Sequence, residues 1–132
     1  MDKENNRKNS KIDKILTIDD WQDGALLGLC TLNGGYCVYE RIFSEERDDY
    51  TDEYFLTPID ETAAAKISEN YRKWCDFMNG GGKAIDWKNS VDISEIAKSS
   101  PRYREFKKRG IFSGKLPDNF HSEISGFFVS WE

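Results

Sequence analysis

Histidine and cysteine, the side chains that most often act as bases, nucleophiles or metal ligands, are scarce in this sequence. His121 is the only histidine, and the three cysteines, Cys30, Cys37 and Cys75, do not have the spacing of zinc ligands. No Gly-x-Ser-x-Gly element is present to hold a serine nucleophile. We read Cys30 and Cys37 as small buried apolar side chains. We therefore expect no metal site, no cofactor and no enzymatic activity.

Two other groups of residues contain only part of a ligand-binding motif. The carboxylates of Asp48, Asp49, Asp52 and Glu53 lack the spacing and the central glycine of an EF-hand loop. The glycines of segment 80–83 follow a predicted helix, whereas a phosphate-binding loop precedes one, so we read them as a helix end. An enzyme would instead need a carboxylate in a buried pocket, for which Glu40 is the candidate.

Charge is distributed unevenly along the chain. Residues 40–61 contain nine acidic residues against two arginines, a balance of −7, and residues 98–115 contain seven basic residues against one glutamate, a balance of +6. The simplest interpretation is two solvated surfaces that partly neutralise each other in the fold.

The functional interpretation of the acidic segment is a docking surface for a basic protein. Charge speeds the encounter of two proteins, and aromatic side chains supply affinity at the centre of an interface. Acidic residues alternate with two tyrosines in this segment. The predicted partner-binding residues are Glu45, Glu46, Asp48, Asp49, Tyr50, Asp52, Glu53 and Tyr54.

The basic segment supports a different interpretation, a surface for nucleic acid. It combines cations with Tyr103 and Phe106, as phosphate-binding and base-stacking surfaces do. These two aromatic residues are three apart, which fits the buried side of a short helix equally well. The alternative nucleic-acid-binding residues are Arg102, Arg104, Lys107, Lys108 and Arg109.

A β-hairpin is the clearest structural signal among the elements that must position these residues. Residues 26–32 and 36–43 are rich in β-forming residues, and Asn33-Gly34 between them favours a two-residue type I′ turn. This turn pairs Cys30 with Cys37 and places a set of residues on one face, which we expect to be the core face and which also carries Glu40. A loop at Gly34-Gly35 is the alternative, and it would change all of these pairings. The set is Leu27, Leu29, Tyr36, Val38 and Ile42.

A long amphipathic helix is predicted to end near Met78, where Asn79 and three glycines follow. It begins either after Thr57-Pro58 or with Asp60 as the N-cap. Spacings of three and four mark one buried stripe along it. The stripe is Ala64, Ile67, Tyr71, Trp74, Cys75 and Met78.

The remaining elements are short. We expect strands at 54–56 and 127–131, and residues 83–87 are a further candidate strand. Residues 15–21 form either a short first strand or an entry segment, and Asp19, Asp20, Asp23 and Gly24 form a turn. A helix capped by Asp92 or Ser94 should run to Lys98, and a basic helix should follow Ser100-Pro101 and end at Arg109. The predicted fold is α+β, with an antiparallel sheet of four to five strands, one long amphipathic helix packed on a face and one or two short helices.

Length and composition are those of one folded domain. The chain has 132 residues, 38% of them hydrophobic and 14% aromatic, and a formal charge of −5. We expect a disordered polar leader at 1–11 and one globular domain at 12–132. The sequence has no transmembrane stretch, no signal-peptide core and no disulfide framework, so we expect a cytoplasmic protein.

These observations favour a small intracellular protein-binding domain, of the inhibitor, immunity-protein, antitoxin or regulatory type. It would bind a partner with a basic surface through the acidic, tyrosine-containing segment. A nucleic-acid-binding accessory protein is the alternative, and an enzyme of unknown chemistry ranks third.

Overall fold

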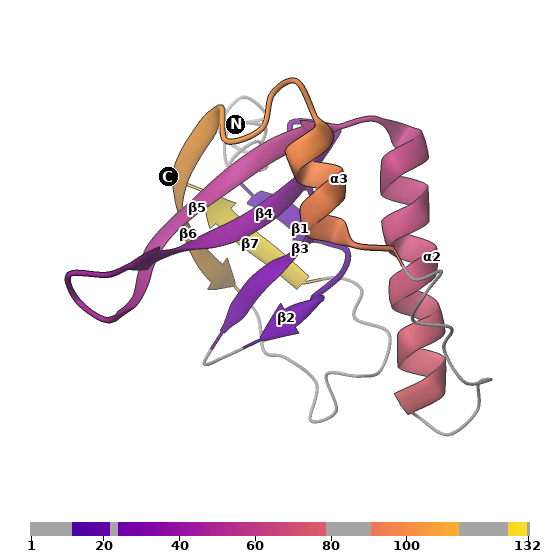
Figure 1. The fold of residues 1–132 in the computed structure, drawn as a ribbon, viewed down its shortest axis with the longest axis horizontal. Coiled ribbons are helices and arrows are strands. Elements are labelled where there is room, and N and C mark those ends of the chain that lie inside the picture. The colour runs from indigo at the N-terminus through magenta and orange to yellow at the C-terminus, as the bar shows by residue number, and fades with distance from the viewer. Residues whose placement is uncertain (1–11, 22–23, 79–90, 114–126, 132) are drawn as a thin grey trace, which may run out of the picture.

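The computed structural model describes residues 12–21, 24–78, 91–113 and 127–131, and Figure 1 shows how their elements are arranged. β-Sheet forms the larger part of the regular structure in these residues. The helices are α2 (Glu61–Met78) and α3 (Ile93–Ser99). The strands are β1 (Ile12–Ile15), β2 (Asp20–Trp21), β3 (Ala25–Leu32), β4 (Gly35–Ser44), β5 (Asp49–Ile59), β6 (Phe106–Ser113) and β7 (Phe127–Trp131).

The sheet closes on itself to form a barrel. Its strands lie in the order β1-β7-β6-β5-β4-β3-β2, and all neighbouring pairs are antiparallel. β1 also pairs with β3 at Ile15 and Cys30, and the N–H groups of Leu16 and Thr17 continue this contact by donating to the Leu29 carbonyl at 2.9 and 3.2 Å. β1, β3, β4, β5, β6 and β7 therefore form the closed barrel, and β2 is a short additional partner of β3.

The predicted α+β fold, an antiparallel sheet of four to five strands with one long helix packed on a face, is therefore wrong. The barrel closes because β1, near the start of the chain, pairs with both β7, near its end, and β3. The sequences of β1, β3 and β7 do not by themselves predict which strands pair. The strand predicted at 15–21 is two short strands on either side of a bend, and the strand predicted at 54–56 is part of the longer β5.

The barrel interior is filled by large aromatic side chains. Tyr54 packs edge-on against both Tyr39 and Trp131, with ring centroids 5.9 and 5.3 Å apart. The Tyr54 hydroxyl donates to the Ala25 carbonyl at 3.0 Å and the Tyr39 hydroxyl to the Thr17 carbonyl at 2.8 Å. Aliphatic side chains and cysteines complete this cluster. They are Ile15, Ile18, Ala25, Cys30, Cys37, Leu56 and Val129.

A second apolar layer lies outside the barrel, between β3–β4 and the two helices. Leu29 and Val38, on the outer face of the hairpin, belong to one buried cluster with Ala64 and Ile67 of α2 and with two residues of α3. The face that the hairpin pattern predicts as the core is this outer face. The opposite face is buried as well, in the barrel interior, so the hairpin is covered on both sides.

The predicted hairpin register is confirmed. Asn33 and Gly34 have φ values of 52° and 83°, as a type I′ turn requires. Cys30 pairs with Cys37 and Leu29 with Val38. The predicted strand at 127–131 is also present, as β7.

The two helices begin at carboxylate caps. Asp60 caps α2 by accepting from the Ala63 N–H at 2.8 Å, whereas Thr57-Pro58 belongs to β5, so the start after Thr57 is wrong. Asp92 caps α3 by accepting from the N–H groups of Ser94 and Glu95. The predicted stripe of α2 is buried at Ala64, Ile67, Tyr71 and Cys75 and half-buried at Trp74, and the Met78 side chain lies outside the described residues.

The predicted basic helix after Ser100-Pro101 is wrong, because this segment forms only a turn and then β6. The Tyr103 and Glu105 N–H groups donate to the carbonyls of Ser100 and Arg102, after which the chain pairs with β5. A strand places alternate residues on opposite faces, and here Phe106 and Gly110 meet the barrel interior while Arg109 is exposed. The predicted strand at 83–87 and the polar leader at 1–11 lie outside the described residues.

Candidate functional site

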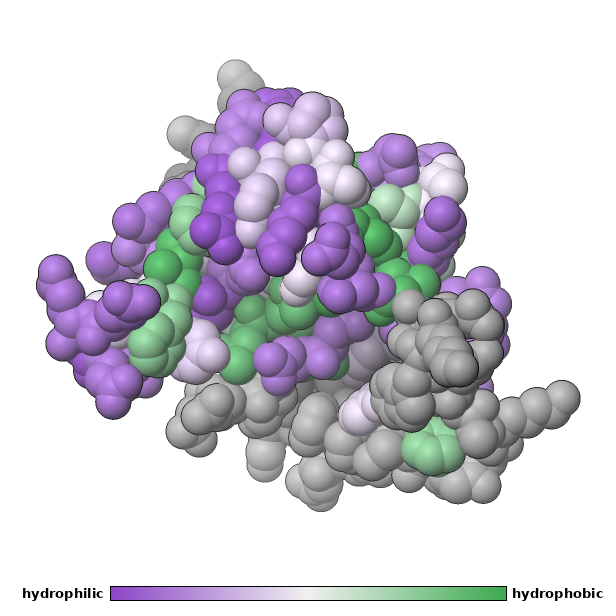
Figure 2. Space-filling view, viewed as in Figure 1, coloured by the Kyte–Doolittle hydropathy of each residue, from purple (hydrophilic) through white to green (hydrophobic). Residues whose placement is uncertain are grey.

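The turn between β4 and β5 projects from the barrel and carries much of the acidic segment. Figure 1 shows this hairpin extending to the left, and Figure 2 shows mainly hydrophilic residues at that end beside a smaller hydrophobic area. We call residues 43–50 the hairpin tip. Its four carboxylates are exposed, and none has an ion-pair partner among the described residues. They belong to Glu45, Glu46, Asp48 and Asp49.

An aromatic pair lies at the start of the tip. Phe43 and Tyr50 are opposite each other on β4 and β5, with ring centroids 5.1 Å apart in an edge-on contact. Phe43 is 45% exposed, which is high for so large an apolar side chain. The tip therefore combines unpaired negative charge with accessible aromatic surface.

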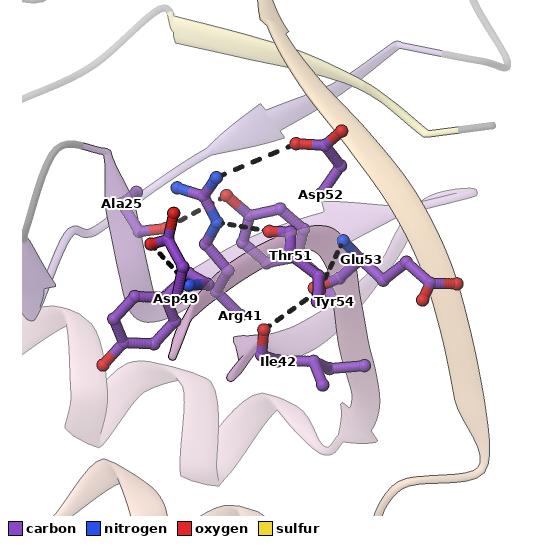
Figure 3. A network of polar contacts seen from close by, with 9 residues as sticks. Ala25, Arg41, Ile42, Asp49, Thr51, Asp52, Glu53 and Tyr54 are labelled. Atoms are coloured by element: carbon purple, nitrogen blue, oxygen red, sulfur yellow. Dashed lines mark hydrogen bonds and ion pairs between the residues drawn. The ribbon is translucent and has the colours of Figure 1, made fainter. Parts of the chain in front are cut away.

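A polar network holds the base of the hairpin, as Figure 3 shows. β4 has a register irregularity between Arg41 and Phe43, and the Thr51 hydroxyl lies opposite it. This hydroxyl donates to the Ile42 carbonyl at 3.0 Å and accepts from the Glu53 N–H at 3.1 Å. Arg41 Nε donates to the Thr51 carbonyl at 2.6 Å. Side chains rather than ladder hydrogen bonds alone thus set the direction in which the tip projects.

Replacing Thr51 with valine should loosen this base without changing the tip. Valine has the same shape and cannot make either hydroxyl contact, so we expect a loss of about 1–2 kcal/mol in the free energy of unfolding. Amide hydrogen exchange across residues 42–50 should become faster. Thr62→Val on the exposed side of α2 is the matched control. Equal exchange rates in the two variants would show that the network does not hold the hairpin.

The remaining residues predicted to bind a partner have contacts within the fold. Asp52 Oδ1 lies 3.9 Å from Arg41 Nη2, and Glu53 Oε1 lies 3.3 Å from Lys107 Nζ. Tyr54 is 3% exposed, and its ring is inside the barrel. The structure thus brings Glu45, Glu46, Asp48, Asp49 and Tyr50 together at the tip and places Tyr54 where no partner reaches it.

The predicted nucleic-acid-binding residues are also mostly occupied by internal contacts. Arg102 pairs with Glu105, and Lys107 pairs with Glu53 across β5 and β6. Arg104 Nη2 lies 3.7 Å from Glu40 Oε1, and its guanidinium is 4.9 Å from the ring centroids of both Phe55 and Tyr103. Lys108 is half-buried, and Arg109 is exposed. The acidic and basic segments therefore partly neutralise each other across the β5–β6 pair.

The Glu40 carboxylate, our candidate for an enzyme, is on the outer face of β4 and is half-buried beside Arg104. The barrel cysteines are unsuited to nucleophilic chemistry, since burial raises the pKa of the Cys37 thiol to about 11 and that of Cys30 well above its usual range. Cys75 is buried in α2, and His121 lies outside the described residues.

A second candidate site, which the sequence pattern did not reveal, is a cleft of about 390 Å³. It opens between β2–β3, α2 and the residues that lead into α3. Three carboxylates, two aromatic side chains and several aliphatic ones line it, and no lysine, arginine or histidine is among its described lining residues. The acidic and aromatic members are Asp19, Asp20, Asp92, Tyr71 and Trp74.

Asp19 is positioned by the bend that connects β1 to β2. Its N–H donates to the Leu27 carbonyl at 2.8 Å, and its carboxylate accepts from the Thr17 hydroxyl. The same hydroxyl accepts from the Leu29 N–H of β3 at 2.9 Å. The Asp19 carboxylate is therefore linked to the barrel through the Thr17 hydroxyl. Burial raises the pKa of the Asp19 carboxyl to about 6; the Thr17 hydrogen bond opposes this shift and the Asp20 charge adds to it.

The other wall of the cleft is tied to α2. Asn70 Oδ1 accepts from the Val91 N–H at 3.1 Å, which fixes the approach to α3 against the long helix. Asp92 is occupied as the cap of α3. The sequence pattern predicts Asp19 and Asp20 as turn residues. The alternation of Thr17, Ile18 and Asp19 before a strand is the available signal that Asp19 is held at a sheet edge.

No group of three or more His, Cys, Asp or Glu residues in the described part of the chain could hold a metal ion. None of the helices in the described ranges combines the length and apolar character needed to cross a membrane. No protein-family model, curated protein or solved structure gives a significant match to this chain.

Proposed function

We propose that this protein binds a partner protein with a basic surface through the β4–β5 hairpin tip, as a cytoplasmic inhibitor or regulator of the immunity-protein or antitoxin type. The observation that carries the proposal is the set of four exposed carboxylates at the end of a projecting hairpin. They have no ion-pair partner among the described residues, although other acidic residues of the same segment do. Unpaired charge in this position is available to a partner.

The shape of the hairpin supports the same proposal. A narrow projection can enter a concave groove, and a groove that binds anionic substrates is positively charged. The carboxylates would speed association, and Phe43 and Tyr50 would supply buried aromatic area once bound. The network around Thr51 holds the tip before binding, which reduces the entropy lost in the complex.

Nucleic acid is the weaker alternative, because Arg102, Arg104 and Lys107 already face carboxylates. Phosphate binding would have to compete with these contacts. Arg109 is the one cation of the predicted set that is exposed and has no ion pair in the described residues.

Charge reversal at the tip tests the proposal. The partner is first captured from native lysate with the tagged wild-type chain, after nuclease treatment, and identified by mass spectrometry. We then expect Glu45→Lys/Glu46→Lys to slow association with that partner at least tenfold at low salt and to weaken the dependence of the rate on salt. Asp48 is left unchanged because its φ of 51° disfavours most other residues.

A matched control variant distinguishes the effect of charge at the hairpin tip from the effect of the net charge of the chain. Glu61→Lys/Asp76→Lys changes the charge of the chain by the same amount on α2, and its effects at the two ends of the helix dipole oppose each other. This control should associate at nearly the wild-type rate. Equal slowing in both variants, or recovery of nucleic acid with no nuclease-resistant partner, would reject docking through the tip.

A further inference from the structure

We propose that this protein forms a dimer with a second copy of itself, in which the hairpin tip of each copy lies on the outer face of β6 of the other. We call Lys14, Arg109 and Ile111 the basic face. The inference does not rest on the partner proposed above, because it concerns the purified chain alone. It would add regulation to the tip, since a tip engaged in the dimer is covered.

The basic face lies on the outside of the barrel. Gly110 faces the interior, where an added Cβ would lie 2.5 Å from a buried tryptophan ring, so Arg109 and Ile111 on either side of it point outward. The β1–β7–β6 register puts Lys14 on the same outer face, because Ile12, two positions before it, is level with Ile111. Ile111 is 52% exposed, which is high for an aliphatic side chain.

The positive charge of this face is not neutralised within the described part of the chain. Neither Lys14 nor Arg109 has an ion-pair partner among the described residues. Glu53 lies opposite Arg109 on β5, but its carboxylate pairs with Lys107 at 3.3 Å. The face therefore presents two unpaired cations beside an exposed aliphatic side chain.

The hairpin tip has the complementary properties. Its four unpaired carboxylates outnumber its one cation, Arg47, and Phe43 beside them is 45% exposed. Opposite charges steer two such surfaces together, and contact between Phe43 and Ile111 would remove apolar area from water. The chain thus carries both halves of an interface.

Contact between copies follows from the rigidity of the hairpin. The Thr51 and Arg41 hydrogen bonds hold its base, and β5 pairs with β6 from Glu53 onward, so the tip cannot fold back onto the basic face of its own chain. The two surfaces lie on neighbouring strands. Two copies related by a twofold axis can therefore make both contacts at once, which closes the assembly as a dimer.

Nucleic acid fits the basic face less well than a second copy does. Two unpaired cations are few for tracking a phosphate backbone, and the chain as a whole has a formal charge of −5. Ile111 has no aromatic ring on which a base could stack. The acidic tip, by contrast, is present at the same concentration as the face itself.

Sedimentation velocity of the untagged full chain tests the dimer. At low salt we expect a dimer with a Kd below about 1 mM, as for a small interface. Raising the salt from about 50 to about 500 mM should weaken it at least tenfold. The tip reversal Glu45→Lys/Glu46→Lys and the face reversal Lys14→Glu/Arg109→Glu should each weaken it at least tenfold as well.

An equimolar mixture of the two reversed variants is the decisive sample. Each variant alone brings like charges together, whereas the mixed dimer pairs opposite charges at both contacts, so the mixture should dimerise at least tenfold more tightly than either variant. Both variants keep a net negative charge, so overall charge does not attract them. Circular dichroism checks their folding, and Arg109→Glu alone replaces the face reversal if the double variant does not fold.

The apolar contact has its own matched control. Ile111→Ser should weaken the dimer by about three- to tenfold, whereas Phe77→Ser, which removes a 40% exposed side chain from α2, should leave it unchanged. The proposal fails if the wild type stays monomeric up to about 1 mM or if the mixture dimerises no better than its components. It also fails if Arg109→Glu abolishes binding of a single-stranded oligonucleotide and leaves the dimer intact. None of these results depends on capture of another protein, so hairpin docking to such a partner is tested separately.

Discussion

Gly28→Ala should lower the free energy of unfolding by about 2–6 kcal/mol, a large effect for one added methyl group. Gly28 is buried in β3 opposite Tyr39 of β4. A Cβ at this position would lie 2.3 Å from the Thr17 carbonyl oxygen and 2.5 Å from the Tyr39 hydroxyl. These two atoms are joined by a buried hydrogen bond, so the methyl group must break it or move the backbone.

Gly28→Ala should be strongly destabilising because Gly28 lies where the barrel closes. Thr17 is in the segment that runs from β1 along β3, where the barrel closes, so a shift there disturbs closure as well as local packing. Overpacking costs about 1–3 kcal/mol, and an unpaired buried hydroxyl and carbonyl cost about 1–3 kcal/mol more. A domain of this size has a total stability of about 5–15 kcal/mol, so the variant should be close to unfolding at elevated temperature.

Urea denaturation of Gly28→Ala and Gly35→Ala provides the measurement. A Cβ at Gly35 meets only the Leu32 carbonyl oxygen at 3.6 Å, an ordinary contact, so this control should change stability by less than about 1 kcal/mol. If Gly28→Ala does not fold, Tyr39→Phe removes the same hydrogen bond without crowding and should cost about 1–2 kcal/mol. Similar denaturation curves for the wild type, Gly28→Ala and Tyr39→Phe would contradict the barrel closure described here.

Asp19→Asn should have the second-largest effect, with the opposite sign: the variant should be about 2–3 kcal/mol more stable than the wild type at pH 7. The folded protein holds the Asp19 proton up to a pKa of about 6, against an ordinary value of 3.8. Between these values the unfolded chain has released a proton that the folded chain keeps. Wild-type stability therefore falls as pH rises from about 4 to about 6 and is constant above that.

The size of this effect follows from the two pKa values. Their separation corresponds to about 3 kcal/mol of lost stability at neutral pH. Asparagine is neutral throughout, and its carbonyl oxygen can still accept from the Thr17 hydroxyl. The free energy of unfolding of the variant should thus match that of the wild type near pH 4 and exceed it at pH 7.

Denaturant unfolding at pH 4, 5, 6 and 7 tests this prediction, with Asp76→Asn as the control that keeps the wild-type pH profile. If the free energy of unfolding of Asp19→Asn falls with rising pH as steeply as that of the wild type, Asp19 is not the group that causes the pH dependence.

Local structure was predicted well where neighbouring residues determine it. The Asn33-Gly34 turn sets the β3–β4 register because both positions require positive φ. Asp92 as the cap of α3 and the buried stripe of α2 also follow from residues within one or two turns of each other. Each of these features depends on contacts over short sequence separations.

The basic segment shows where local patterns mislead. Tyr103 and Phe106 have helical spacing, and Ser100-Pro101 resembles a helix start, yet the chain turns and pairs with β5 from Phe106 onward. Pairing with an existing strand, and the contact of Lys107 with Glu53, outweigh a weak helix preference. The predicted partner residue Tyr54 is buried for a related reason, since its strand is flanked on both sides and its ring faces the barrel interior.

The sequence by itself determined the hairpin, both helices, the last strand and the separation of acidic from basic segments, because these depend on turn geometry, caps and periodicity over a few residues. Only the tertiary structure decided that the sheet closes, that the basic segment neutralises part of the acidic one, and that Asp19 faces a cleft. Closure depends on pairing β1 with β3 and β7, and the cleft on packing β2–β3 against α2. Such contacts join residues far apart in the chain, and no local pattern encodes them.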